Sequence, residues 1–347
     1  MSDLTYGLGP VNMTPDVQVA MGGEPDAHRG ERFAEMLAGA KSRLCALAGA
    51  SACEVMVGSG TLANDVVAGQ LKALGGCGII VSQGEFGERL RDHAHRWRLP
   101  FEAHFVREGQ AIDLDTLSGT LESCGPYEWL WVCACETSTG VLNDIEALAA
   151  FCKKYKMLLV LDAISAIGSV PVDLSGVYLA SASSGKGLAS YPGLGVVLYN
   201  YEPEPAPWAL PRYLDLGLWA KRRGVPFTGS SNLLYALWTT LQMTDWSARY
   251  ERIDEIGDDF GTFLYLKGVK TVAEAEVQAP HVWTISTGDR PSVDVGRALA
   301  GRGFAVSFES PHQIARNQIQ IGFSGGNLDD YDDIELLADA IASEIRA

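Results

Sequence analysis

Apolar and polar positions follow two alternating periods along the first half of the chain. Short runs that are apolar throughout, typical of buried strands, are separated by stretches whose apolar positions recur every three or four residues, as in helices that bury one face. Strands that alternate with helices predict an α/β fold with a mostly parallel sheet covered on both faces. The predicted strands are Glu54–Val57, Gly78–Ser82, Glu102–Val106, Trp129–Cys135, Met157–Leu161, Leu179–Ser183 and Gly195–Tyr199; the predicted helices are Glu31–Leu47, Thr61–Leu74, Glu88–Trp97, Leu114–Ser123 and Ile145–Tyr155.

The pattern changes from about Trp208 onward. Loops that contain proline and tryptophan are followed by one long predicted helix, Ser231–Arg252. We expect an N-terminal segment (residues 1–20) that packs near a small C-terminal α/β domain (residues 246–347), with a large domain (residues 21–245) between them in sequence. The elements predicted for the small domain are strands at Val282–Thr287, Ala305–Phe308 and Gln318–Gly322 and a closing helix at Tyr331–Ile345.

The composition is that of a soluble globular protein with a strong acidic excess. Of 347 residues, 47% are hydrophobic and 20% are charged, and the formal net charge is −16. Phosphate contacts need clustered Lys and Arg, so no nucleic-acid partner is expected and any anion site must be local. Neither a signal peptide nor an apolar run long enough to span a bilayer is apparent, so we expect a cytoplasmic protein with no membrane partner. The seven cysteines are scattered without a Cys-x-x-Cys spacing, and no metal site is expected.

Polar clusters follow several of the predicted strands. Gly58-Ser59-Gly60-Thr61 lies between a strand and a helix, where free backbone amides and hydroxyls can hold a phosphate. Two other interpretations of this turn are open. It is either an ordinary capped strand–helix turn or a dinucleotide-binding turn, although the third glycine of the dinucleotide fingerprint is replaced by Asn64.

Two further clusters could contact a planar ligand. Phe86 lies between two glycines at a strand end, where an aromatic ring can stack on another ring or can simply be part of the core. Glu136-Thr137-Ser138-Thr139-Gly140 places three hydroxyls at the end of the predicted strand Trp129–Cys135, where they can bind a ligand oxygen or cap the following helix.

A carboxylate and an amine complete the set. Asp162 ends the apolar run Met-Leu-Leu-Val-Leu-Asp, and Lys186 lies among small residues on a loop between two predicted strands. Such a lysine can hold an aldehyde cofactor as a Schiff base, and the acid can keep the pyridine nitrogen of that cofactor protonated. Taken singly, each of the two can equally be a turn residue or a surface residue.

The order of these motifs resembles the class V, fold-type I pyridoxal-phosphate-dependent aminotransferases, in particular the branch that contains alanine–glyoxylate, serine–pyruvate and 2-aminoethylphosphonate–pyruvate aminotransferases. The resemblance covers nearly the whole chain, from Gly9-Pro10 to Gly322. It implies that pyridoxal 5′-phosphate is the cofactor and that Lys186 and Asp162 are catalytic. The remaining cofactor contacts implied are Ser59, Gly60 and Thr61 at the phosphate, Phe86 stacked on the ring, Thr137 near the ring oxygen, and Thr228 from a neighbouring subunit of a homodimer whose sites lie at the interface.

The chain departs from the family pattern at two positions. Gly185 stands where Gln or Asn often precedes the lysine, and Gln320 stands where an arginine usually binds the substrate carboxylate or phosphonate. Arg316, Arg29 or the pair Arg222/Arg223 can replace that arginine. The candidates for substrate binding are therefore Asn12, Arg29, Arg316 and Gln320.

The function that these features favour is transfer of an amino group between a small amino acid or amine (alanine, serine or a 2-aminoethylphosphonate-like donor) and a 2-oxo acid such as pyruvate or glyoxylate. A lyase, elimination or decarboxylation reaction on the same fold is the alternative that Gln320 and Gly185 leave open. A nucleotide-dependent dehydrogenase would leave Lys186 unexplained, and a non-catalytic binding protein would leave both Lys186 and Asp162 unexplained.

Overall fold

A seven-stranded sheet forms the centre of the protein in the computed structural model, which describes residues 4–347 apart from the side chains of residues 4 and 122–124. All neighbouring strands are parallel except β10, which is antiparallel to both of its neighbours. The expected mostly parallel sheet is therefore confirmed. In spatial order the strands are β2 (Ala52–Val57), β10 (Leu194–Tyr199), β9 (Leu179–Ser183), β8 (Leu158–Asp162), β5 (Trp129–Cys133), β3 (Gly78–Ser82) and β4 (Phe101–Phe105).

Successive residues of a strand point to opposite sides of the sheet, so these apolar strands give the sheet two apolar faces. Helices cover both of them. In β5, Leu130 and Val132 belong to one apolar core, and Trp129 and Trp131 belong to the other. The first core is closed by α2 (Glu31–Ala48), α5 (Leu114–Cys124), α6 (Ile145–Tyr155) and α8 (Ser231–Met243), and the second by α3 (Gly60–Leu74), α4 (Glu85–Trp97) and α7 (Leu216–Lys221).

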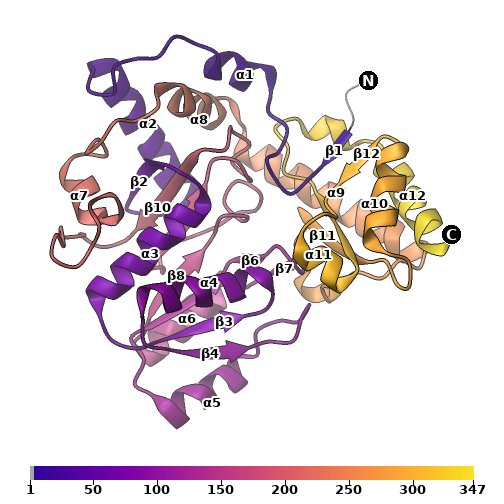
Figure 1. Cartoon of the computed structure of the whole chain (residues 1–347), viewed down its shortest axis with the longest axis horizontal. Helices are drawn as coiled ribbons and strands as arrows, with labels where there is room; N and C mark the ends of the chain where they lie inside the picture. Colours follow the sequence, from indigo (N-terminus) through magenta and orange to yellow (C-terminus); the bar gives the residue numbers. More distant parts are fainter. Residues whose placement is uncertain (1–3) are drawn as a thin grey trace.

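A third core lies in the C-terminal part of the chain, beside the large sheet (Figure 1). It includes Tyr6, which follows from the parallel pairing of β1 with β12 near the start of the chain. The predicted division at residues 20 and 245 stays a prediction. The elements here are β1 (Leu4–Tyr6), α9 (Trp246–Leu266), β11 (Val282–Ser286), α10 (Ser292–Gly301), β12 (Phe304–Val306), α11 (Pro311–Arg316), β13 (Gln318–Gly322) and α12 (Ile334–Arg346).

The single long helix predicted at Ser231–Arg252 is wrong. The chain forms two helices, α8 and α9, with Thr244 and Asp245 extended between them. Asp245 accepts a hydrogen bond from the backbone N–H of Ala248 at 3.2 Å, so it starts a new helix where apolar spacing alone suggested continuity. Elements that the pattern did not predict are β1, α1 (Pro15–Met21), β6 (Cys135–Glu136), β7 (Val141–Leu142), α7, α10, α11 and the short 3-10 turns Arg212–Leu214, Ala275–Val277 and Leu328–Tyr331.

Within the described residues, no helix has both the length and the apolar character needed to cross a membrane. The same part of the chain contains no group of three or more His, Cys, Asp or Glu side chains that could hold a metal ion. Cys124, one of the seven cysteines, lies outside the described side chains.

A buried histidine makes stability depend on pH. His281, just before β11, is 1% exposed, and burial lowers its pKa from 6.5 to about 4. Between about pH 6.5 and pH 4 the unfolded chain binds a proton at His281 that the folded chain does not. The free energy of unfolding is therefore unaffected by His281 above about pH 6.5 and decreases as the pH falls toward 4. The total decrease is about 3 kcal/mol.

Urea unfolding measures the free energy of unfolding at pH 8 and at pH 4.5. We expect its decrease between these two pH values to be about 2 kcal/mol smaller in His281→Gln than in the wild type. The exposed His95 offers a control, because the free energy of unfolding of His95→Gln should decrease between these pH values by as much as that of the wild type. An equal loss of stability in all three proteins would contradict this assignment.

Candidate active site

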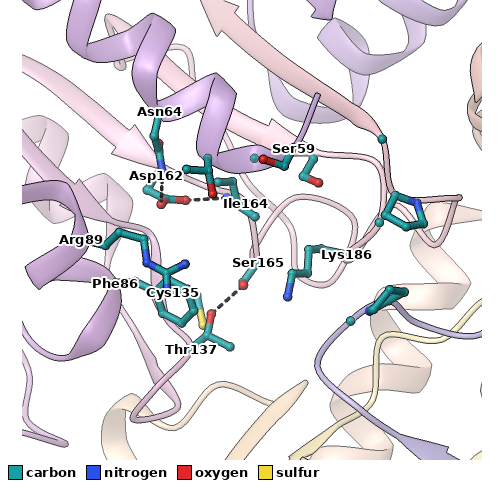
Figure 2. A pocket seen from close by; sticks show the side chains of 18 residues that line it. Ser59, Asn64, Phe86, Arg89, Cys135, Thr137, Asp162, Ile164, Ser165 and Lys186 are labelled. Atoms are coloured by element: carbon teal, nitrogen blue, oxygen red, sulfur yellow. Dashed lines mark hydrogen bonds between the residues drawn. The ribbon is translucent and has the colours of Figure 1, made fainter. Parts of the chain in front are cut away.

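The carboxyl ends of the parallel strands meet at one edge of the large sheet and border a cavity of about 300 Å³. Figure 2 shows that the polar side chains from these strand ends converge on it. The structure thus brings together Ser59, Gly60, Thr61, Phe86, Thr137, Asp162 and Lys186, all of which the sequence analysis had selected. The complete lining is Gly9, Pro10, Ser59, Gly60, Thr61, Asn64, Phe86, Arg89, Cys135, Thr137, Asp162, Ile164, Ser165, Ser183, Gly185, Lys186, Pro192 and Gly193.

The N-terminus of α3 forms one wall of the cavity. Ser59 is the N-cap residue, but its side chain makes no cap hydrogen bond, so backbone N–H groups of the first turn remain for a ligand. A Cβ at Gly60 would lie 2.6 Å from Cδ1 of Ile164, so a larger residue here would require the Ile164 side chain to shift. A helix N-terminus opened in this way is suited to a phosphate group.

Asp162 lies at the base of the cavity and is 7% exposed. Burial raises the pKa of its carboxyl group, and hydrogen bonds from Asn64 Nδ2 (2.8 Å) and the backbone N–H of Ile164 (3.0 Å) oppose that rise. Ser181 Oγ in turn donates to Asn64 Oδ1 at 2.6 Å and fixes the amide orientation. The sequence analysis assigned no role to Asn64, although it lies one turn after Gly60 on the same helix.

Lys186 enters the cavity opposite Asp162 (Figure 2). Burial is the main reason that the pKa of its amine is lowered; the charge of Arg89 acts in the same direction, and Asp162 opposes both. Its Nζ donates a hydrogen bond to the carbonyl of Leu8 at 2.8 Å. A Cβ on Gly9, whose φ is +130°, would lie 2.9 Å from Lys186 Cδ, so a glycine lets the N-terminal segment pass close to the lysine.

Close packing accounts for the departure at Gly185. A Cβ at this position would lie 2.8 Å from Cβ of Pro192, and no larger residue fits without a shift of the backbone. The neighbouring loop therefore occupies the space that a glutamine or asparagine side chain would need.

Phe86 is held in place by a buried carboxylate that sequence reasoning did not select. Glu136 is fully buried and accepts hydrogen bonds from the backbone N–H groups of Phe86 (3.2 Å) and Gly87 (2.8 Å). Burial raises the pKa of Glu136, and hydrogen bonds from Ser138, Gly87 and Phe86 oppose the rise. Glu136 thus joins the aromatic turn to the turn that carries Thr137, whose Oγ1 donates to Ser165 Oγ at 2.6 Å.

Arg89 is a second site residue that the sequence analysis missed. It lines the cavity, its guanidinium carbon lies 4.8 Å from the centroid of the Phe86 ring, and its Nη2 contacts Glu85 at 2.7 Å. Its position three residues after Phe86 on α4 was the available signal, since residues at that spacing share one helix face.

The structure does not bring the other predicted residues to the cavity of the same chain. Asn12, Arg29 and Thr228 are exposed, and Thr228 borders a separate, largely apolar hollow with Phe33 and Phe227. Arg316 forms a salt bridge with Glu108 instead. Their roles in binding stay predictions.

Gln320 is 7% exposed, and its side chain is used in protein hydrogen bonds. Nε2 donates to the carbonyl of Thr137 (2.7 Å) and to Thr284 Oγ1 (2.9 Å), and Oε1 accepts from Gln313 Nε2 (2.9 Å). A neutral, internally bonded amide therefore connects β13 to the turn that carries Thr137.

Comparison with known proteins defines the family. The family model of the class V aminotransferases matches residues 20–208. The crystal structure of an alanine–glyoxylate aminotransferase from Nostoc sp. is similar over 100% of this chain and 96% of that one, with a TM-score of 0.86 and 25% identity. The chain therefore belongs to the class V aminotransferase family.

Two sequence relatives are similar to about 70% of the chain, and they carry different names. The soluble hydrogenase 42 kDa subunit of Anabaena cylindrica is 34% identical over 253 residues, which cover 68% of this chain and 64% of that protein. The chain thus spans less than two thirds of the length of this relative. A 2-aminoethylphosphonate–pyruvate transaminase of Pseudomonas putida is 27% identical over 270 residues, which cover 73% of each protein.

Pyridoxal phosphate is the cofactor of this family, and the residues at the cavity fit it. The uncapped N-terminus of α3 suits the phosphate, the buried Asp162 suits a ring nitrogen, and the half-buried amine of Lys186, whose pKa is lowered, suits an aldehyde. Phe86 adds an aromatic surface on the same cavity.

Proposed function

We propose that the chain is a pyridoxal-phosphate-dependent aminotransferase that transfers an amino group between a small amino acid or amine and a 2-oxo acid such as pyruvate or glyoxylate. The observation that carries this proposal is the placement of a half-buried amine, Lys186, and a buried carboxylate, Asp162, on one cavity beside a helix N-terminus. The names of the alanine–glyoxylate and 2-aminoethylphosphonate–pyruvate relatives support the choice of donor and acceptor.

Each part of the cofactor has a residue to hold it. Ser59, Gly60 and Thr61 would bind the phosphate through the first turn of α3, and Phe86 would stack on the ring. Thr137 would contact the ring oxygen, with its hydroxyl oriented by the bond to Ser165. When bound, the cofactor supplies an aldehyde that reacts with primary amines and a ring that accepts electrons.

The chain itself supplies charge and proton transfer. Asp162 places a carboxylate where it stabilises a protonated ring nitrogen, and its bonds from Asn64 and Ile164 favour the charged form of the acid. Because burial lowers the pKa of Lys186, a larger share of its Nζ is neutral, and a neutral amine is both a nucleophile and a base. Lys186 Nζ is therefore the group that takes up and returns the proton at the substrate carbon.

We further propose a cytoplasmic homodimer with active sites at the interface, without nucleic-acid or membrane partners. Thr228 is exposed and outside the cavity of its own chain, which supports a role in the phosphate site of a neighbouring subunit. The net charge of −16 disfavours nucleic acid. Analytical ultracentrifugation tests the dimer, and a fully active monomer would rule it out.

The test of the proposed reaction is a single half-reaction without an acceptor. Mixing the cofactor-loaded protein with a panel of donors (alanine, serine and 2-aminoethylphosphonate) should convert the aldehyde form of the cofactor to the amine form, followed by absorbance. Release of ammonia or of an unsaturated product without that conversion would identify a lyase instead. If the purified protein stays colourless after pyridoxal phosphate is added, the assignment of this cofactor is wrong.

The neutral Gln320 predicts how the substrate preference can be changed. Gln320→Arg places a cation where Gln320 now bonds Thr137 and Thr284, and a charge-assisted bond to a carboxylate contributes about 1.5–3 kcal/mol. We expect kcat/KM for alanine, relative to ethylamine, to rise by about 10-fold or more. Ethylamine is the matched donor because it is alanine without the carboxylate.

Gln318→Arg is the control for this substitution. Gln318 lies two residues earlier on β13, and its amide faces Glu108 rather than Thr137. A folded Gln320→Arg variant with an unchanged alanine-to-ethylamine ratio, or an equal rise in the control, would show that Gln320 does not face the substrate carboxylate.

A further inference from the structure

A buried arginine, Arg249, joins three segments, one of which is the loop that carries Lys186. Arg249 lies in the first turn of α9 and is 6% exposed. Its guanidinium donates four hydrogen bonds, all to backbone carbonyls: Nε to Gly168 (2.8 Å), Nη1 to Gly325 (2.8 Å), and Nη2 to Ser324 (2.9 Å) and Gly187 (3.2 Å). Gly187 directly follows Lys186, so one of these bonds reaches the active-site loop itself.

The charge of Arg249 has no partner of opposite sign. Among the residues that the structure describes, no carboxylate lies within salt-bridge distance of it. Burial lowers the pKa of Arg249 to about 10, which still leaves the group charged at neutral pH. Burying a cation without a counter-ion costs free energy. The compensating stabilisation of Arg249 must therefore come from its hydrogen bonds. A planar guanidinium has five N–H donors in a fixed fork, whereas lysine has a compact ammonium with three.

Two of the bonded segments touch each other directly. Gly168 belongs to the loop that follows Asp162, and a Cβ on Gly168 would lie 2.6 Å from the carbonyl carbon of Gly187. A Cβ on Gly187 would in turn lie 2.3 Å from Ser169 Oγ. Arg249 bonds the carbonyls of both glycines and therefore fixes the loop after the acid against the loop that carries the amine.

The loop after Lys186 is strained and needs such support. Ala189 has φ +48°, in the left-handed region that residues with a side chain rarely adopt, and its N–H donates to the carbonyl of Lys186 at 2.8 Å. The N–H of Ser190 donates to the carbonyl of Ser184 at 3.0 Å and closes the same loop. Strained backbone persists only where the surroundings hold it, and the bond from Arg249 to Gly187 lies within this turn.

The third segment belongs to the C-terminal part of the chain. Ser324 and Gly325 follow β13, the strand that carries Gln320, and Ser324 Oγ also lies 2.9 Å from Ser169 Oγ. The same guanidinium therefore bonds both the segment that follows β13 and the loop that carries Lys186, and it holds the two together.

We propose that Arg249 is a positioning residue for Lys186 and that it acts through the geometry of its guanidinium fork, not through its charge alone. This inference rests on the proposed function, in which Lys186 Nζ moves a proton at the substrate carbon. A displacement of about 1 Å in such a group costs about 100-fold in rate, so loss of the fork should reduce kcat while the contacts that bind substrate remain.

Two variants and a control test the proposal. Arg249→Met removes the fork and the charge at similar length, and Arg249→Lys keeps the charge without the fork. The control is Arg252→Met, one turn later on α9, where the arginine is partly exposed and contacts Asp332 and Glu255 instead. We expect both Arg249 variants to lose about 100-fold in kcat with KM changed less than about 3-fold, and the control to retain wild-type kinetics.

Hydrogen exchange of the cofactor-free proteins supplies a readout that does not depend on turnover. The backbone N–H groups of Ala189 and Ser190 should exchange about 10-fold faster in the Arg249 variants, while the central strands β5 and β8 remain unchanged. If Arg249→Met does not fold, Arg249→Lys carries the test alone.

Three results would overturn the inference: full rescue of kcat by Arg249→Lys, faster exchange spread evenly over the whole chain, or Arg249 variants that match the Arg252 control. Failure of the wild type to convert any donor would reject the proposed function instead. In that case the exchange measurement still decides whether Arg249 orders the lysine loop.

Discussion

Lys186→Ala should lower kcat by roughly 10⁴-fold, the upper end of what one acid–base group contributes. The loss is expected to be this large because Lys186 supplies the amine that faces the cavity opposite Asp162 and no other lysine lines that cavity among the described residues. Steady-state assays with the best donor from the half-reaction panel would measure it. Borohydride treatment of the wild type, followed by peptide mass spectrometry, should find the reduced cofactor on Lys186.

Lys186→Arg separates the roles of charge and of the primary amine. It keeps a cation at the same position but has no amine that can bond to an aldehyde, so it should be as inactive as the alanine variant. The exposed Lys221 provides a control, because Lys221→Ala should retain full activity. Cofactor found on a different lysine after reduction would contradict the assignment of Lys186.

Asp162→Asn should lower kcat by about 10²–10³-fold, the usual cost of removing one preorganised electrostatic group from a site. The substitution keeps the size of the side chain and an oxygen that can accept the bond from Ile164 N, but removes the negative charge at the base of the cavity. The absorbance of the bound cofactor should change as well, because its ring nitrogen loses the carboxylate that favours protonation.

Asp65→Asn is the matched control for that substitution. Asp65 is next to Asn64 on α3 but is paired with His93 (2.9 Å) outside the cavity. If both variants lose the same activity, the effect of Asp162→Asn reflects packing of α3 rather than charge at the cofactor.

The fold, and the meeting of most candidate cofactor residues at one cavity, could be predicted because their signals are local. Each buried strand is a short apolar run, and the polar residue that follows it is adjacent in sequence, as at Asp162. Parallel strands bring such ends to one edge without any further information, which explains why Ser59, Phe86, Thr137 and Lys186 share one cavity.

The supporting contacts could not be predicted because they join distant residues. Leu8 accepts the bond from Lys186 across 178 positions, and Gln320 reaches Thr137 across 183. Glu136 was visible as part of a motif, but only the fold shows that its carboxylate is directed to the Phe86 turn and not to a ligand. The break before α9 was missed for a different reason: a cap residue such as Asp245 interrupts a helix without interrupting the apolar spacing.

The pairing of β1 with β12 makes residues 4–8 a short connection between the C-terminal core and Lys186. Tyr6 is fully buried in the C-terminal core, and two residues later the carbonyl of Leu8 accepts the hydrogen bond from Lys186. Only Gly7 lies between Tyr6 and Leu8, so the position of the Leu8 carbonyl beside the Lys186 amine is set by how the C-terminal core packs against the large sheet.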